Sequence, residues 1–146
     1  MVAPVTLVTL LGVVSSLALP AAAEGIIPVS EVGCWKDKVD PQRIEEAKTK
    51  LENWGRKHRI GNGSMHGEKA NLSAVWICNC KHFEDDHVVA AELDETQALV
   101  EDKCGVGVAG WVWSKKWNKA FNIGTSVKMD NGHTHSDKCP HFCIWD

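Results

Sequence analysis

Several features that mark common classes of protein are missing from this chain of 146 residues. It has no excess of basic side chains, because 16 Lys and Arg against 19 Asp and Glu give a formal net charge of −3. That balance gives no indication of a nucleic-acid or anionic-membrane partner. The chain has no internal repeat and no Gly-x-Ser-x-Gly, His-Glu-x-x-His or phosphate-loop motif. The sequence therefore points to none of the enzyme classes that those motifs mark.

Beyond residue 23 the chain also lacks an apolar run long enough to span a bilayer. Residues 2–19 form a run that approaches this length, since they carry no charged side chain, and Pro20 and three alanines follow them. The alanines place small residues at the −3 and −1 positions of a cleavage after Ala23, as in secretory signal peptides. We predict a signal peptide over residues 1–23 and one secreted, extracellular domain over residues 24–146. A retained membrane anchor is the alternative interpretation.

Two glycosylation sequons agree with export. They are Asn62-Gly63-Ser64 and Asn71-Leu72-Ser73, and both fit Asn-x-Ser with a centre other than proline. Each lies in or beside an expected loop. The sequence therefore predicts glycosylation at Asn62 and Asn71.

The cysteines follow the expected cleavage point, and their number is even. They are Cys34, Cys78, Cys80, Cys104, Cys139 and Cys143. An even number in a short exported chain predicts a disulfide framework, although six cysteines allow 15 pairings. In a strand, Cys78 and Cys80 project from the same face, so we expect them to bridge two different partners. The alternative is a zinc site that adds His82 and His141, which the Cys-x-Cys spacing fits poorly.

Periodicity in the sequence predicts an α+β fold. Asp40 and Pro41 mark the start of a helix whose apolar stripe runs from Ile44 to Trp54, and the basic residues 56–59 suit its carboxyl end. Residues 72–80 alternate as a strand does, and a second helix is expected from Asp85 or Asp86 to Gly105. We therefore predict two helices packed on a small, mostly antiparallel sheet that is stapled by disulfides.

The remaining segments are less regular. Residues 24–33 suggest a loosely held arm, and the alternation of Trp111, Val112 and Trp113 predicts a strand from about Val108. The pair Asn131-Gly132 favours a tight hairpin turn.

The chain has seven tryptophans and no tyrosine. We expect Trp54, Trp76 and one of Trp111 and Trp113 to fill a thin core. Trp117 is different, because it lies in an expected loop beside Lys115 and Lys116. Exposed aromatic rings among polar groups stack on sugar rings or anchor in a protein partner. Trp117, Lys115 and Lys116 are therefore the candidate binding residues.

Histidines provide the candidates for chemistry. The types that a ribonuclease-like mechanism requires are present at His66, His82, His87 and Glu68, but no motif fixes their geometry. A second cluster, with His133, His135 and His141 beside Asp130 and Asp137, has the His-x-His spacing of a metal site, but a polar hairpin tip is the commoner explanation of such a cluster and we prefer it. We predict no catalytic residue, no metal and no cofactor.

The chain resembles the small cysteine-rich secreted proteins of filamentous fungi. The segments that carry the resemblance are "LPAAA", "VWICNC", "DKCG", "GWVWSKKW" and "CPHFC". Disulfide-bonded proteins with two helices and an antiparallel sheet also look like fungal killer toxins. The resemblance implies a released protein that perturbs a host or a competitor, often without catalysis.

Our leading expectation is a monomeric, non-catalytic effector that binds a host protein or a cell-wall glycan and suppresses host defence. No nucleic acid or membrane partner is expected, and uptake into host cells is left open. The alternatives are an antimicrobial or killer-type toxin, a glycan-binding module that uses Trp117, and a secreted ribonuclease-like enzyme.

Overall fold

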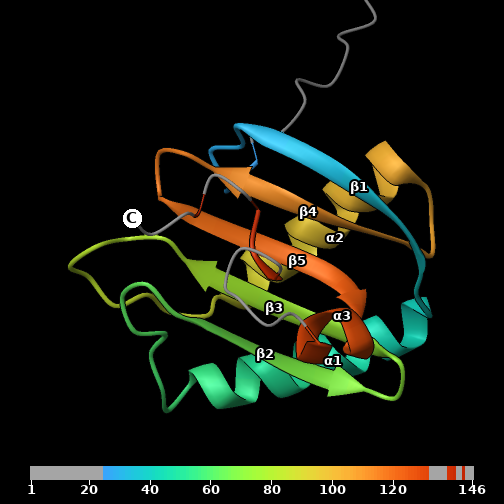
Figure 1. The fold of residues 1–146 in the computed structure, drawn as a ribbon, viewed down its shortest axis with the longest axis horizontal. Helices are drawn as coiled ribbons and strands as arrows, with labels where there is room; N and C mark the ends of the chain where they lie inside the picture. Colours follow the sequence, from blue (N-terminus) through green and yellow to red (C-terminus); the bar gives the residue numbers. More distant parts are fainter. Residues whose placement is uncertain (1–24, 132–137, 141–142, 144–146) are drawn as a thin grey trace, which may run out of the picture.

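The computed structural model describes residues 25–131, 138–140 and 143, and Figure 1 shows how they are arranged. In chain order the elements are β1 (Glu31–Lys38), α1 (Pro41–Gly55), β2 (Met65–Ala70), β3 (Ser73–Asn79), α2 (Ala90–Cys104), β4 (Val108–Ser114), β5 (Lys119–Thr125) and α3 (Ser126–Asn131). The strands form one antiparallel sheet in the order β1-β4-β5-β3-β2. The predicted α+β class is confirmed, and the short α3 is a third helix that the sequence did not indicate. No helix in the described part of the chain has both the length and the apolar character that crossing a bilayer requires.

Helix α1 begins as predicted and ends early. Asp40 caps it, because its Oδ1 accepts a hydrogen bond from the Gln42 backbone N–H at 2.9 Å, and Pro41 occupies the first turn. The helix stops at Gly55 and does not continue towards residue 59. The Trp54 carbonyl explains the stop, since it accepts a hydrogen bond from the Lys57 backbone N–H at 3.1 Å, a tighter turn than α-helical geometry.

Helix α2 begins at Ala90, so the prediction of a start at Asp85 or Asp86 is wrong. The Asp86 carboxylate accepts a hydrogen bond from the His87 backbone N–H at 2.7 Å and does not cap a helix. The backbone of Asp86 also pairs with that of Ile60 as an isolated antiparallel bridge, which keeps this segment extended. The helix ends before Gly105 as expected, where φ is 96°.

Two further expectations are corrected. The arm predicted over residues 24–33 is partly a strand, because β1 starts at Glu31 and pairs with β4. Gly33 permits this pairing, since a Cβ at that position would clash with the Trp111 ring. Asn131 is the last residue of α3 and not the first half of a hairpin turn, and Gly132 lies outside the described residues.

Both faces of the sheet are covered. Helices α1 and α2 lie on one face and α3 lies on the other (Figure 1). Aliphatic residues dominate the helix-side core, whose sheet residues include Val75, Ile77 and Phe121. The opposite core contains Trp76, Trp113, Met129 and four half-cystines. The predicted burial of Trp76 and of Trp113 is confirmed, and Trp54 is partly buried against the helix-side core.

Three disulfides tie the elements together, as predicted. They join Cys34 to Cys104, Cys78 to Cys139 and Cys80 to Cys143. The two cysteines of β3 and its end therefore have different partners, as their shared face requires. The zinc alternative is wrong for these cysteines, because bridged sulfurs are not available as thiolate ligands.

Candidate functional site

Two loops meet at one end of the sheet, on the left in Figure 1. One loop follows β3 over residues 80–89, and the other is the β4–β5 turn over residues 115–118. The Cys80 backbone N–H donates to the Asn118 carbonyl at 2.9 Å and links the two loops. Asn118 has φ of 47°, a left-handed conformation that asparagine tolerates well, and this allows the tight turn. The disulfide from Cys80 to Cys143 fixes the start of the first loop.

Two adjoining hollows open between these loops. The end hollow has a volume of about 460 Å³ and is lined by Lys81, His82, Phe83, Glu84, Lys116, Trp117 and Asn118. The charged hollow has a volume of about 210 Å³ and is lined by Lys81, Asp86, His87, Glu92, Trp117 and Lys119. Lys81 and Trp117 contribute to both, so the two hollows form one continuous surface.

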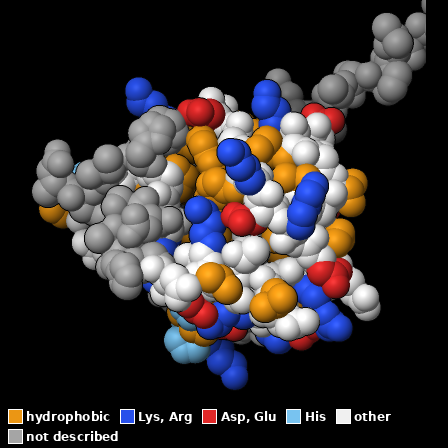
Figure 2. Space-filling model, turned by 45° about the vertical axis from the view of Figure 1, so that its right-hand side comes forward, with side chains coloured by type: hydrophobic (Ala, Val, Ile, Leu, Met, Phe, Trp, Pro, Cys, Tyr) orange, Lys and Arg blue, Asp and Glu red, His pale blue; other side chains and the backbone are white. Residues whose placement is uncertain are grey.

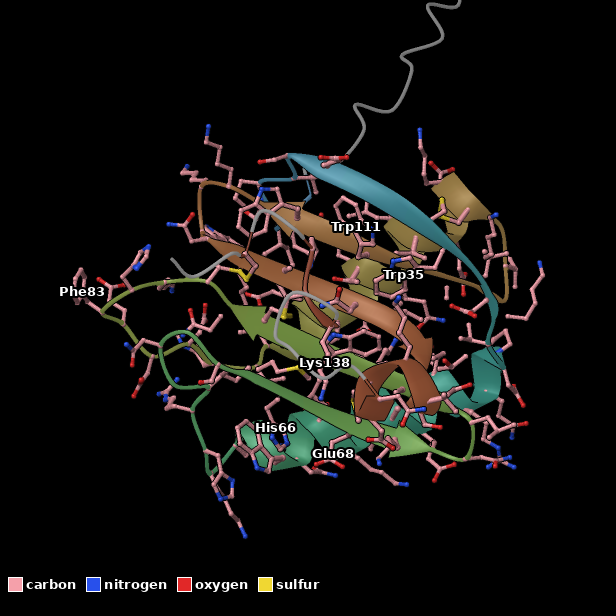
Figure 3. All side chains as sticks on the ribbon, in the orientation of Figure 1. Trp35, His66, Glu68, Phe83, Trp111 and Lys138 are labelled. Atoms are coloured by element: carbon pink, nitrogen blue, oxygen red, sulfur yellow. A yellow bond between two sulfur atoms is a disulfide. The ribbon has the colours of Figure 1, made fainter. Side chains whose placement is uncertain are left out.

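The two aromatic rings of the end hollow differ in how firmly they are held. Trp117 is partly buried and packs against the helix-side core, so its ring is anchored. Phe83 is 96% exposed and projects from the tip of its loop, away from the sheet (Figure 3). Its described ring neighbour is His82, whose centroid lies 6.1 Å away. What sets Phe83 apart from the other exposed apolar side chains is that it shares the end hollow with Trp117, and paired aromatic side chains commonly anchor ligands and partners.

A buried asparagine holds the loop that carries Phe83. Asn79 is the last residue of β3, and its Nδ2 lies 3.0 Å from the Ile60 carbonyl, 3.1 Å from the Gly61 carbonyl and 2.8 Å from the Glu84 carbonyl. Its Oδ1 accepts a hydrogen bond from the Lys81 backbone N–H at 3.1 Å. Because a buried amide must satisfy its hydrogen bonds, these contacts fix the positions of both neighbouring loops.

The charged hollow is built around a buried lysine. Lys119 on β5 is 2% exposed, and its Nζ lies 3.1 Å from Asp86 Oδ1 and 2.7 Å from Glu92 Oε2. It also donates to the His87 carbonyl at 2.8 Å. Lys81 Nζ lies 3.1 Å from the other Asp86 oxygen, so this carboxylate contacts two ammonium groups. The cluster fastens the loop over residues 80–89 and the first turn of α2 to the sheet.

The electrostatics keep Asp86 ionised. Burial by itself raises the pKa of this carboxyl, which is 4% exposed. The Lys119 charge, the His87 backbone N–H and the Lys81 ammonium together outweigh burial, so the pKa of Asp86 lies below its ordinary value. A carboxylate held in this state is suited to fixing structure rather than to exchanging protons near neutral pH.

The structure brings together some of the residues that the sequence singled out. Trp117 and Lys116 line the end hollow, and Lys115 lies exposed beside them on the same turn. Neither lysine forms an ion pair with another described residue, so both ammonium groups are available to a ligand. Phe83 and Asn79 also belong to this site, although neither is among the residues expected from the sequence. Asn79 had a visible signal, since it is a polar residue in the otherwise apolar strand "AVWICN".

The candidate acids and bases are divided between two places. His82 lines the end hollow and His87 lines the charged hollow. His66 and Glu68 lie together on β2, with Nε2 and Oε1 3.2 Å apart (Figure 3). The Trp54 ring stacks on His66 with centroids 3.5 Å apart, and on its other neighbour His58 at 4.9 Å.

The remaining candidates from the sequence are the two glycosylation sequons and the cluster of histidines and aspartates over residues 130–141. Asn62 and Asn71 are both exposed, and Asn71 occupies the β2–β3 turn with φ of 54°. His133, His135, Asp137 and His141 lie outside the described residues, whereas Asp130 forms an ion pair with Lys69 at 2.7 Å. No group of three or more potential metal ligands occurs in the described ranges. On the face in Figure 2, Lys and Arg side chains are interspersed with acidic and apolar ones.

Comparison of the chain with models of protein families, with curated proteins and with solved structures finds no match.

Proposed function

We propose that this chain is a secreted, non-catalytic binding protein of the effector type, and that the end hollow binds a cell-wall oligosaccharide. The observation that carries the proposal is the pair of Phe83 and Trp117 in one open hollow on a cross-linked frame. Capture of wall fragments would withhold them from the host receptors that trigger defence. By such capture, a protein without catalytic activity would suppress the defence response of the host.

The composition of the hollow supports a sugar ligand. Flat aromatic faces pack against the apolar C–H faces of sugar rings, and nearby polar groups bond the hydroxyls. The lining supplies such groups from Asn118, His82, Glu84 and Lys116. The hollow is wide and open at the surface, so a short stretch of a long polysaccharide could enter it. A protein partner anchored on Phe83 is the competing outcome of the tests below.

The state of the charged groups supports binding over catalysis. Lys119 and Lys81 balance the charges of Asp86 and Glu92 in the charged hollow, and the pKa of Asp86 is lowered. General acids and bases need a pKa near the working pH and a free approach to the substrate. These charged groups instead hold the loop over residues 80–89 in place. The disulfides separately suit a protein that works outside the cell, where conditions are oxidising.

The first test is depletion of the purified, oxidised protein by insoluble chitin and by insoluble β-glucan. We expect depletion by one of these polymers and its loss in Phe83→Ala. The matched control is Val106→Ala, which removes another exposed apolar side chain, 72% exposed, from the loop between α2 and β4. Binding that survives in Phe83→Ala, or that is lost equally in Val106→Ala, would contradict the proposal.

The second test connects binding with defence. Leaf tissue is treated with the protein, and the oxidative burst is triggered separately with chitin and with a bacterial peptide. We expect suppression of the chitin response alone, and no suppression by Phe83→Ala. Suppression of both responses would indicate a host signalling protein as the target. Growth inhibition of competing microbes without any suppression would favour the toxin alternative.

One geometric observation favours the ribonuclease-like alternative. His66 and Glu68 lie 3.2 Å apart, and a histidine beside a carboxylate is a combination that RNA cleavage uses. This alternative predicts RNA cleavage that is lost in His66→Ala and kept in Phe83→Ala. The same pair of variants therefore separates the two functions.

A further inference from the structure

A glycosylation sequon lies against the loop that forms the end hollow. Residues 61–64 make a tight turn in which the Ser64 backbone N–H donates to the Gly61 carbonyl at 3.1 Å. Gly63 has φ of 64° at the third position of the turn, a conformation that glycine adopts without strain. Asn62 is therefore left at the exposed corner of the turn.

The amide of Asn62 is bonded to a residue of the hollow. Its Nδ2 donates to the His82 carbonyl at 2.8 Å. The next backbone N–H, from Gly63, donates to the Lys81 carbonyl at 3.1 Å. His82 and Lys81 both line the end hollow, and Phe83 follows them directly. The atom that would carry a sugar thus lies within hydrogen-bonding distance of the loop that presents Phe83.

We propose that glycosylation of Asn62 controls access to the end hollow. The inference rests on the binding function proposed above and adds a regulatory modification to the same site. The amide nitrogen forms a bond to C1 of a sugar supplied by a lipid-diphosphate-linked oligosaccharide. The bond from C1 to the diphosphate oxygen breaks, the lipid diphosphate leaves with the electron pair, and the amide loses one proton. The sugar chain then begins beside residues 82–84 and covers Phe83.

The second sequon is a natural control. Asn71 lies in the two-residue turn between Ala70 and Ser73, at the far end of the β2–β3 hairpin from the end hollow. A glycan there adds the same mass and solubility without approaching Phe83. If glycans acted only through bulk or solubility, the two sites would behave alike.

The experiment compares forms secreted by a yeast host, with occupancy at each sequon measured by mass spectrometry of glycopeptides. Ser64→Ala removes the sequon and leaves the Asn62 amide in place, whereas Ser64→Thr keeps the sequon. Asn71→Asp removes the remote sequon and retains a side chain that tolerates positive φ. The wild-type chain made in an oxidising bacterial compartment supplies the form without glycan.

Two readouts are measured, and one of them needs no ligand. Chymotrypsin cleavage after Phe83 reports access to the ring, and depletion by the wall polymer reports binding. We expect the Asn62-glycosylated form and Ser64→Thr to be cleaved about tenfold more slowly, and to bind about tenfold more weakly, than Ser64→Ala. Asn71→Asp should match the glycosylated wild type in the rate of cleavage after Phe83 and in polymer binding.

The outcomes separate the two proposals. Equal or faster cleavage after Phe83 in the Asn62-glycosylated form, or an unoccupied Asn62 in both the wild type and Ser64→Thr, overturns the inference. Slower cleavage with no polymer binding by any form supports control of access and contradicts the proposed glycan ligand. Equal effects at Asn71 would overturn the inference in favour of a general effect of glycans.

Discussion

The buried Lys119 is the group whose removal tests the account of the charged hollow most directly. In Lys119→Met the aliphatic stem is kept, so packing over the Phe121 ring, whose centroid lies 5.0 Å from Nζ, is largely retained. The substitution removes the ammonium group, whose Nζ lies 3.1 Å from Asp86 Oδ1 and 2.7 Å from Glu92 Oε2. Both carboxylates are buried, so the substitution leaves negative charge in the interior without its main partner.

The magnitude follows from this burial. Breaking a buried ion pair by removing one partner costs about 3–5 kcal/mol, because the remaining charge is uncompensated. Asp86 keeps Lys81 at 3.1 Å, which places the expected loss in the free energy of unfolding at about 3 kcal/mol. The assay is urea unfolding of the oxidised protein at pH 7, followed by tryptophan fluorescence. The matched control is Lys115→Met, at an exposed site, which should change stability by less than about 0.5 kcal/mol.

The pH dependence gives a second, independent check. In the wild type the pKa of Asp86 is lowered in the folded state, so its contribution to stability is present above pH 3.8 and is lost as the pH falls through the lowered value. In Lys119→Met the main cause of lowering is gone, and burial moves the pKa of Asp86 upwards. In the folded variant Asp86 therefore binds a proton at a higher pH than in the wild type. The difference in free energy of unfolding between the wild type and the variant becomes smaller as the pH falls from 7 to about 4.5. A loss below about 1 kcal/mol, or a deficit that does not change with pH, would refute the reasoning.

Three further predictions follow from the same structure. Phe83→Ala should weaken polymer binding at least about tenfold while the free energy of unfolding changes by less than about 0.5 kcal/mol, and a large stability loss would show that Phe83 is not exposed. Replacing Cys80 and Cys143 together by serine should lower the free energy of unfolding by about 2–5 kcal/mol and accelerate chymotrypsin cleavage after Phe83; unchanged cleavage would contradict the role of this disulfide. His66→Ala should lower the free energy of unfolding by about 1 kcal/mol, because the ring stack on Trp54 is lost. Calorimetry should then show a melting temperature lower by about 4 °C, and an unchanged melting temperature would show that the stack does not stabilise the fold.

Local patterns in the sequence were sufficient where the structure depends on neighbouring residues. Asp40 followed by Pro41 is read correctly as the start of α1, because capping and the first helical turn involve only adjacent positions. The start of α2 is different. Asp86 is an equally good cap by type, but Lys119, 33 residues later, binds its carboxylate and the chain there stays extended. No local pattern contains that information.

The candidate site shows the same division. Trp117 and Lys116 could be selected in advance, because a tryptophan among lysines in a turn is conspicuous. Phe83 could not, since an isolated phenylalanine is buried more often than it is exposed. Its exposure comes from the hydrogen bonds of Asn79 to the Glu84 carbonyl and to the loop at Ile60, and these contacts exist only after folding.

The tryptophans and the disulfides have a common explanation in the second face of the sheet. Every residue of β3 is buried, so both faces are covered, yet only one face has long helices. On the other face Trp76 is 0% exposed, stacks on Trp35 at 5.5 Å between centroids and donates from Nε1 to the Lys138 carbonyl at 2.7 Å.

Large flat side chains fill that thin layer. Cys78 of β3 is bridged to Cys139, and Cys80, directly after β3, is bridged to Cys143, each across more than 60 residues of chain. Packing on both faces and the disulfides together stabilise a sheet whose core is small. In the proposed binding function, the hydrogen bonds of Asn79 to the Ile60 and Glu84 carbonyls position the loop of Phe83 before a ligand arrives, so less conformational entropy is lost on binding.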